Sequence, residues 1–214
     1  MVCGKGNNGG DGFVIARAAA KDGWSVTVLL AEGEPKTADS ILNFERLHSL
    51  PVHICTDCSV LETQHFDAAV DALYGTGFHG ELRPSGLAAC GLMRRLHKSG
   101  AFVLAVDLPS GINTDTGEVA EGAAHADLTV TFDSYKPLHM AESSAPLCGK
   151  IVCADIGIRM NGTRSFDEAC RCGKAPARKR PRQLSRHAGV LFVILLQNVC
   201  TFLAERRKYG NRLI

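Results

Sequence analysis

The sequence predicts an α/β protein, a Rossmann-like three-layer sandwich with a mostly parallel central sheet. Three observations favour this fold class. Apolar, β-branched runs alternate with segments of helical periodicity along residues 1–161 of the 214-residue chain. These runs read as strands buried on both faces, which is typical of a parallel sheet covered by helices. A glycine-rich stretch at 4–12 stands in front of the first predicted helix, as at an anion site on a helix N-terminus.

The glycine-rich stretch reads Gly-Lys-Gly-Asn-Asn-Gly-Gly-Asp-Gly, with five glycines in nine residues. Glycine permits positive φ and lets a ligand approach bare backbone N–H groups, so we expect a loop that binds a phosphate. The asparagine and aspartate side chains can cap the following helix or hold a cation, and a tight turn with an Asx cap is the alternative. The helix is predicted over 13–21 and is ended by Gly23 as a left-handed cap.

The strands are predicted from apolar, β-branched runs. They lie at 24–30, 52–54, 68–70, 101–106, 127–132 and 150–156. Residues 1–3 are too short for a strand, although the glycine-rich stretch requires one in front of it. We therefore expect either the stump of a strand or a chain start further upstream.

Two more helices connect these strands. Thr37 is placed to cap a helix that extends to Leu50, and Pro84 suits the first turn of the next helix. We expect the apolar residues at helical spacing to form the inner face of each helix. These residues are Ile41, Phe44, Leu47, Leu87, Cys90, Met93 and Leu96.

Composition points to a globular protein of at most two domains, with 45% apolar residues. Its nine cysteines are an odd number without a framework spacing. No charged and apolar N-terminal segment marks the chain for secretion. A cytoplasmic, reducing location therefore fits best.

The charge divides the chain in two. Residues 1–161 carry 12 Lys and Arg against 19 Asp and Glu, a balance of −7, whereas residues 162–214 carry 12 against 3, a balance of +9. We predict a folded domain at 1–161 and, at 162–214, a basic and apolar tail that is disordered or aberrant. A basic run at 175–182 and an apolar run at 188–204 leave binding to a membrane or to nucleic acid as the alternative, and we expect neither partner.

Polar residues follow three predicted strands at the carboxyl edge of the sheet, where ligands bind in this fold class. Asn8, Asp71 and Ser110 offer an amide oxygen, a carboxylate and a hydroxyl, which suit an alkali or alkaline-earth cation. Asp107 stands before a Leu-Pro-Ser-Gly turn that fixes the direction of its carboxylate. Either carboxylate could instead brace neighbouring backbone. Lys136 supplies a positive charge for a phosphate or is a solvated surface lysine.

Four motifs in series resemble those of NAD(P)H-hydrate epimerase. They stand at 4–12, at 70–77 (Val-Asp-Ala-Leu-Tyr-Gly-Thr-Gly), at 106–113 (Val-Asp-Leu-Pro-Ser-Gly-Ile-Asn) and at 126–132 (Ala-Asp-Leu-Thr-Val-Thr-Phe), and 155–158 resembles the closing strand of that domain. The resemblance covers about residues 1–160. We expect the first strand and the helix before it to be missing, and no dehydratase domain follows residue 161.

The resemblance implies an isomerase that interconverts the R and S forms of hydrated NADH and NADPH, with an ADP- or ATP-dependent NAD(P)H-hydrate dehydratase as its functional partner. It implies a potassium ion held by Asn8, Asp71 and Ser110, and Asp107 as the catalytic residue at the dihydropyridine ring. A homodimer is compatible with it. Contacts to the hydrated dinucleotide are implied for Asn7, Asn8, Gly9, Gly10, Asp11, Gly75, Thr76, Gly77, Phe78, His79, Gly80, Glu81 and Asp107.

Two other functions remain open from the sequence. Residues 4–9 fit the G-x-G-x-x-G pattern of a Rossmann-type NAD(P)-dependent oxidoreductase, with Glu32 as its acidic partner. The Asn-Asn and Gly-Asp insertions are not what such a turn needs. The other alternative is a truncated, non-catalytic homologue that binds only nucleotides or a protein.

Overall fold

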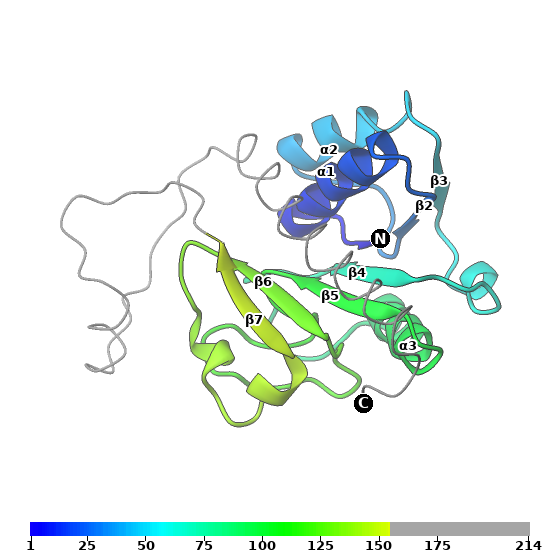
Figure 1. The fold of residues 1–214 in the computed structure, drawn as a ribbon. Coiled ribbons are helices and arrows are strands. Elements are labelled where there is room, and N and C mark those ends of the chain that lie inside the picture. The colour runs from blue at the N-terminus through cyan, green and yellow to red at the C-terminus, as the bar shows by residue number, and fades with distance from the viewer. Residues whose placement is uncertain (155–214) are drawn as a thin grey trace.

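A computed structural model describes residues 1–154, which form one seven-stranded sheet with helices against both faces (Figure 1). The strands are Val2–Cys3 (β1), Val26–Leu30 (β2), Val52–Cys55 (β3), Ala68–Ala72 (β4), Phe102–Val106 (β5), Leu128–Phe132 (β6) and Lys150–Ala154 (β7). The helices are Asn7–Lys21 (α1), Ala38–Glu45 (α2) and Pro84–Lys98 (α3), with short 3-10 turns at Ser59–Leu61, Pro137–His139 and Ala145–Leu147. The predicted α/β class is confirmed.

The sheet has the order β3-β2-β1-β4-β5-β6-β7, and every pairing in it is parallel. The chain builds β1, β2 and β3 outward in one direction and then returns to place β4 on the other side of β1. Loops at the carboxyl ends of β1 and β4 therefore diverge, and this opening is where doubly wound sheets bind ligands. Among residues 1–154, no helix is long and apolar enough to cross a membrane.

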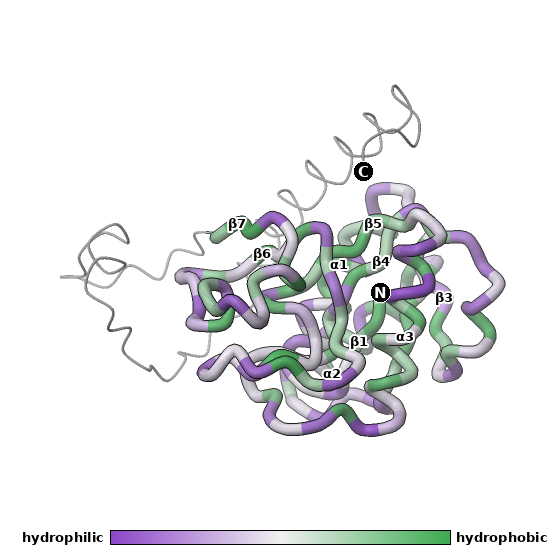
Figure 2. The backbone as a smooth tube through the Cα atoms, turned by 90° about the horizontal axis from the view of Figure 1, so that it is seen from below, coloured by the Kyte–Doolittle hydropathy of each residue, from purple (hydrophilic) through white to green (hydrophobic). Residues whose placement is uncertain are grey.

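Two apolar layers enclose the sheet. In β5, Phe102, Leu104 and Val106 pack in the cluster that contains α1 and α2, while Val103 and Ala105 pack in the cluster of α3. This alternation of side chains explains why the strand is apolar throughout. Figure 1 shows α1 and α2 on one side of the sheet and α3 on the other, and Figure 2 shows hydrophobic colour along the strands.

The first strand is short but central. β1 is only two residues long, yet it lies in the middle of the sheet, between β2 and β4. Its backbone is held on both sides, because Leu29 N–H donates to the Met1 carbonyl at 2.8 Å and Gly4 N–H donates to the Ala72 carbonyl at 3.0 Å. Of the two alternatives expected for residues 1–3, the structure thus contains a short strand, and the missing segment before it stays a prediction.

The helix predicted to reach Leu50 ends at Glu45 instead. Leu47 N–H donates to the Phe44 carbonyl at 2.9 Å, a tight bond between residues three apart that takes the place of the α-helical pattern. Thr37 is the N-cap residue as predicted, but its side chain makes no capping hydrogen bond. Ile41, expected on the inner face, is 40% exposed.

Three predictions lie outside the described residues. They are the end of the strand predicted at 150–156, the motif at 155–158 and the tail at 162–214.

Candidate functional site

The predicted site residues meet at the carboxyl edge of the sheet, around β1, β4 and β5. Asn8 lies in the first turn of α1, Asp71 is the fourth residue of β4, and Asp107 directly follows β5. Because these strands are adjacent, side chains that are far apart in the sequence come together here.

Helix α1 begins at Asn7, so most of the glycine-rich stretch is helix rather than loop. The N-cap is Gly6, which has no side chain to make a capping bond, so Asn7 and Asn8 are not the cap but residues of the first turn. Gly10 N–H donates back to the Gly6 carbonyl at 3.2 Å. The N–H groups before it lie in the first turn, where a helix has no internal acceptors. This helix end therefore keeps the features of an anion site.

The glycines serve close packing rather than left-handed backbone. None of those at 4–12 has a positive φ. A Cβ on Gly9 would lie 1.8 Å from the Gly4 carbonyl oxygen, and one on Gly12 would lie 2.7 Å from both Cys3 Sγ and Ala72 Cβ. Without side chains at these positions, α1 approaches β1 and β4 directly. Positive φ, one of the two reasons given for these glycines from sequence, is thus wrong, while close approach of a ligand to the N–H groups stays a prediction.

Asp71 and Ser110 form a buried, doubly bonded pair. Ser110 donates its backbone N–H to Asp71 Oδ2 at 2.7 Å and its hydroxyl to Oδ1 at 2.6 Å. Leu73 N–H adds a third bond at 3.2 Å. Neither Asp71 nor Ser110 has exposed surface. The pair fastens the turn after β5 to the end of β4.

Asn8 joins the same network through the backbone of Tyr74. Ser110 Oγ accepts from Tyr74 N–H at 2.9 Å, and the Asn8 side-chain NH₂ donates to the Tyr74 carbonyl at 2.9 Å. The Asn8 amide also lies against Gly75, where a Cβ would be 3.5 Å from Asn8 Oδ1. The three residues predicted to share a cation therefore lie in one connected cluster.

Asp71 is a carboxylate without a positively charged neighbour among the described residues, since it takes part in none of their ion pairs. Burial raises the pKa of Asp71 to about 6, although the bonds from Ser110 and Leu73 act in the opposite direction. A buried anion that is bonded only to neutral donors gains from a nearby cation. The hydroxyl and amide oxygens beside Asp71 are, like its carboxylate, hard oxygen atoms of the kind that bind alkali or alkaline-earth cations.

Asp107 sits in a strained backbone conformation at the end of β5. Its φ is 71°, in the left-handed region that residues other than glycine enter at a cost. Its N–H donates to the Val130 carbonyl at 2.8 Å, and its Oδ1 accepts from the Thr131 hydroxyl at 2.9 Å. The residue is only 1% exposed. The strand end thus aims the carboxylate across β6.

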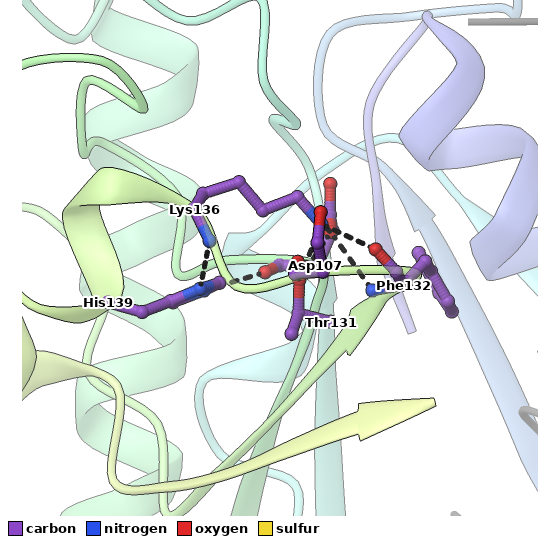
Figure 3. A network of polar contacts seen from close by, with 6 residues as sticks. Asp107, Thr131, Phe132, Lys136 and His139 are labelled. Carbon is purple, nitrogen blue, oxygen red and sulfur yellow. Dashed lines mark hydrogen bonds and ion pairs between the residues drawn. The ribbon is translucent and has the colours of Figure 1, made fainter. Parts of the chain in front are cut away.

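Lys136 is not a solvated surface lysine. Its Nζ lies 2.5 Å from Asp107 Oδ1 and 2.5 Å from Thr131 Oγ1, and it donates to the Phe132 carbonyl at 3.0 Å (Figure 3). The Lys136 side chain is 16% exposed and that of Asp107 is 2% exposed. An ammonium and a carboxylate in direct contact can exchange a proton. Sequence reasoning left the role of this lysine open.

His139 is a site residue that the sequence did not reveal. Its ring is buried, and it contacts the main chains of both Asp107 and Lys136 (Figure 3). The only signal was its position three residues after Lys136, and this spacing carries no recognised motif.

The predicted binding loop at 75–81 lies beside the turn that carries Asp107. Phe78 packs against Tyr74 with ring centroids 5.2 Å apart, and His79 Nδ1 lies 3.4 Å from Asn113 Nδ2. Phe78 is buried, Gly75 and Thr76 are half-buried, and Gly77, His79, Gly80 and Glu81 are exposed. On α1, Asn7 is exposed, Asn8 and Asp11 are half-buried, and Gly9 and Gly10 are buried.

Glu32, the acidic partner considered for an oxidoreductase, lies just beyond the end of β2. Its Oε1 accepts from the Tyr74 hydroxyl at 2.8 Å, and its Oε2 lies 3.8 Å from Lys5 Nζ. Burial and the neighbouring Glu32 carboxylate raise the pKa of Tyr74. The Glu32 carboxylate is thus already bonded within the protein.

The sequence model of the family described as "YjeF-related protein N-terminus" matches residues 1–138. Among curated relatives, a bifunctional NAD(P)H-hydrate repair enzyme Nnr from Methanothermobacter thermautotrophicus is 38% identical over 169 residues, covering 74% of this chain and 31% of that protein. An NAD(P)H-hydrate epimerase from Pirellula staleyi is 36% identical over 167 residues, covering 74% of this chain and 72% of that protein. The chain thus spans about a third of the bifunctional relative and most of the single-activity one.

The fold is similar to that in the crystal structure of the yeast protein ynu0. The TM-score is 0.58 with 23% sequence identity, covering 85% of this chain and 73% of that chain. At this identity the likeness supports the fold.

Proposed function

Because this chain belongs to the family described as YjeF-related protein N-terminus, we propose that it is an isomerase that interconverts the R and S forms of hydrated NADH and NADPH. The names of two relatives support this reaction, one an epimerase and one a repair enzyme of NAD(P)H hydrate. The observation that carries the proposal is the contact between Asp107 and Lys136 at the ligand-binding edge of the sheet.

The dinucleotide would bind across the N-terminus of α1 and the loop at 75–81. Residues 1–161 have a charge balance of −7, so general electrostatic attraction cannot hold a pyrophosphate. Local donors have to do so, and the first-turn N–H groups of α1 without a side-chain cap are suited to this task. Gly6 leaves open space beside them, because a Cβ there would meet no atom within 4 Å.

The reaction requires a proton at the hydroxyl of the hydrated ring carbon. When that hydroxyl leaves as water, the lone pair of the ring nitrogen forms an iminium ion, and water returning on the opposite face gives the other epimer and releases a proton. Asp107 would pass a proton from the Lys136 ammonium to the leaving hydroxyl, and its carboxylate would then stabilise the positive ring. The proton released when water adds on the opposite face would return through Asp107 to Lys136. Proton transfer by a positioned group contributes roughly 10²–10⁴-fold.

A potassium ion would be held by Asn8, Asp71 and Ser110. The support is the buried Asp71 carboxylate, whose partners are neutral, and the hard oxygen atoms of the other two residues. When bound, the ion supplies positive charge that offsets Asp71 and adds attraction for the anionic dinucleotide. Asn8, Asp71 and Ser110 would then hold the start of α1 and the ends of β4 and β5 in fixed positions relative to one another.

We predict that potassium stabilises the full chain in a manner that depends on pH. The ion requires ionised Asp71, whose pKa is about 6 in the fold, so the potassium effect should be full above pH 7 and disappear below pH 5. At tenfold excess over its Kd, potassium should add about 1.4 kcal/mol, or roughly 3–5 °C in Tm. Melting curves in potassium and choline salts of equal ionic strength measure this difference.

The control is Asp71→Asn, which removes the charge at nearly constant shape. Its Tm should be the same in both salts at every pH. Equal melting temperatures of the wild type in potassium and choline above pH 7 would exclude the cation.

We further propose that the S form passes to an ADP- or ATP-dependent NAD(P)H-hydrate dehydratase. The support is the name of the relative from Methanothermobacter thermautotrophicus, a bifunctional NAD(P)H-hydrate repair enzyme. Cytoplasmic location and a homodimer stay predictions.

A Rossmann-type oxidoreductase is the second candidate, favoured by the close packing of Gly9 on Gly4 and by Glu32 beyond β2. One experiment separates the two. Chromatography of purified R and S hydrates, after subtraction of spontaneous epimerisation, should show interconversion with the full chain. Nicotinamide absorbance should stay constant, because epimerisation changes no redox state. A change of absorbance with added alcohol or ketone substrates, without interconversion, would favour the oxidoreductase.

A further inference from the structure

We propose that His139 is a positioning residue, which fixes the Asp107–Lys136 pair by bonding to the main chain of each partner. This inference rests on the proposed function, because it assigns a role within the same site. It concerns a residue that neither the sequence motifs nor the chemistry of the reaction would have selected.

The ring of His139 uses both of its nitrogens. Lys136 N–H donates to Nδ1 at 3.0 Å, and Nε2 lies 3.1 Å from the Asp107 carbonyl oxygen (Figure 3). A nitrogen that accepts from an N–H group carries no hydrogen, so the neutral ring has its hydrogen on Nε2. Nε2–H therefore donates to the carbonyl of Asp107. One ring thus connects the loops that follow β5 and β6.

These two bonds act where the backbone needs support. Asp107 has a φ of 71°, and such conformations cost about 1–3 kcal/mol unless their surroundings hold them. Lys136 is the N-cap of the 3-10 turn Pro137–His139, and the ring satisfies its N–H group. If the ring were absent, the Asp107 carbonyl and the Lys136 N–H would lose their partner together. The Asp107 carboxylate and the Lys136 ammonium, which these backbones carry, would then lose their relative positions.

The His139 ring both caps the 3-10 turn Pro137–His139 and reaches the loop that follows β5. His139 is 3% exposed and lies next to an apolar cluster formed by Leu108, Ile112, Leu138 and Cys148. A leucine or phenylalanine would fill the same space but would not provide these bonds to the Lys136 N–H and the Asp107 carbonyl. The buried ring directs its two nitrogens to the two residues that form the ion pair, and the ring makes no other hydrogen bond among those recorded for the described residues.

The arrangement depends on a neutral ring. Burial is the main cause that lowers the pKa of His139 below its usual 6.5, and the positive charge of Lys136 adds to it. The groups that face the ring are Lys136, Asp107 and Tyr135, whose ring packs edge-on at 6.1 Å. Protonation at acidic pH would remove the acceptor for Lys136 N–H and place two cations side by side. The kcat of the wild type should therefore fall at acidic pH, and part of this fall should be due to protonation of His139.

Three variants of the full chain separate the two bonds. His139→Gln keeps a donor near the position of Nε2, His139→Asn keeps an acceptor near the position of Nδ1, and His139→Leu keeps neither. We expect kcat for epimerisation to fall about tenfold in each amide variant and about a hundredfold in the leucine variant, with KM within about threefold. The part of the fall in kcat at acidic pH that is due to His139 should be absent in all three variants. His53→Gln, at an exposed position of β3, is the control and should behave as wild type.

NMR spectra recorded without substrate test directly whether His139 positions Lys136. In ¹⁵N NMR spectra of the full chain, we expect the Nε2–H tautomer of His139 at pH 7 and a slowly exchanging ammonium signal from Lys136. That ammonium signal should be lost in His139→Leu, or in the amide variants if the leucine variant does not fold. An unchanged Lys136 signal, or kcat within twofold of wild type in a folded leucine variant, would overturn the proposal. Absence of turnover in wild type would refute the proposed function, while the NMR result would still decide the role of His139.

Discussion

Asp107→Asn is expected to reduce the interconversion of R and S hydrates at least about a hundredfold while binding of the hydrated dinucleotide stays nearly unchanged. Asparagine has the shape of aspartate and tolerates the left-handed backbone at φ 71°, so the turn after β5 should keep its conformation. It can still accept a bond from Thr131, but it cannot take up a proton. In the proposed binding mode the phosphates lie at the start of α1 and at residues 75–81, away from Asp107. The affinity for the hydrated dinucleotide should therefore be retained.

The matched control is Asp133→Asn. Asp133 also follows a strand, β6, and has a φ of 65°, but its side chain is exposed. The same substitution is therefore made at a residue with the same left-handed backbone conformation but outside the site. Turnover of this variant should equal that of the wild type. Chromatographic separation of the epimers gives the rates, and equilibrium titration gives the affinity. Near-normal turnover of Asp107→Asn would assign the proton transfer to another residue.

Gly9→Ala is expected to destabilise the fold by about 2 kcal/mol or more. An alanine in a helix is favoured over glycine by about 1 kcal/mol, so intrinsic propensity alone predicts a more stable protein. The added Cβ would lie 1.8 Å from the Gly4 carbonyl oxygen, which is backbone at the end of β1 and cannot swing aside. Overpacking typically costs 1–3 kcal/mol and occasionally more. At this separation the clash should exceed the gain in propensity.

Gly6→Ala provides the comparison within the same motif. Its Cβ would have no atom within 4 Å, and Gly6 has a φ of −95°, which alanine adopts readily. We therefore expect a change of less than about 0.5 kcal/mol. Urea unfolding of both variants, followed by the fluorescence of the single tryptophan, Trp24, measures the difference. Equal stabilities would mean that these glycines serve ligand approach rather than packing.

The sequence by itself determined the fold class and the edge at which the site lies. Short β-branched, apolar runs between turn residues, such as 102–106, favour a strand, because burial on both faces requires apolar side chains at every position. Parallel strands bring their carboxyl ends to one edge, so the clustering of Asn8, Asp71 and Ser110 followed from the order of the elements. Gly23, with a φ of 85° after α1, was likewise readable from local chemistry.

Tertiary structure alone decided the features that depend on distances between separate elements. The start of α1 at Asn7 could not be read from five glycines, because Gly9 and Gly12 serve close contact with residues of β1, β4 and the adjoining Gly4 rather than special torsion angles. The pairing of Lys136 with Asp107 depends on the neighbouring positions of β5 and β6, and so does the bridging ring of His139. Local sequence patterns report burial and propensity over a few residues. Polar contacts between distant residues are set by how the elements pack, so they became visible only in the folded chain.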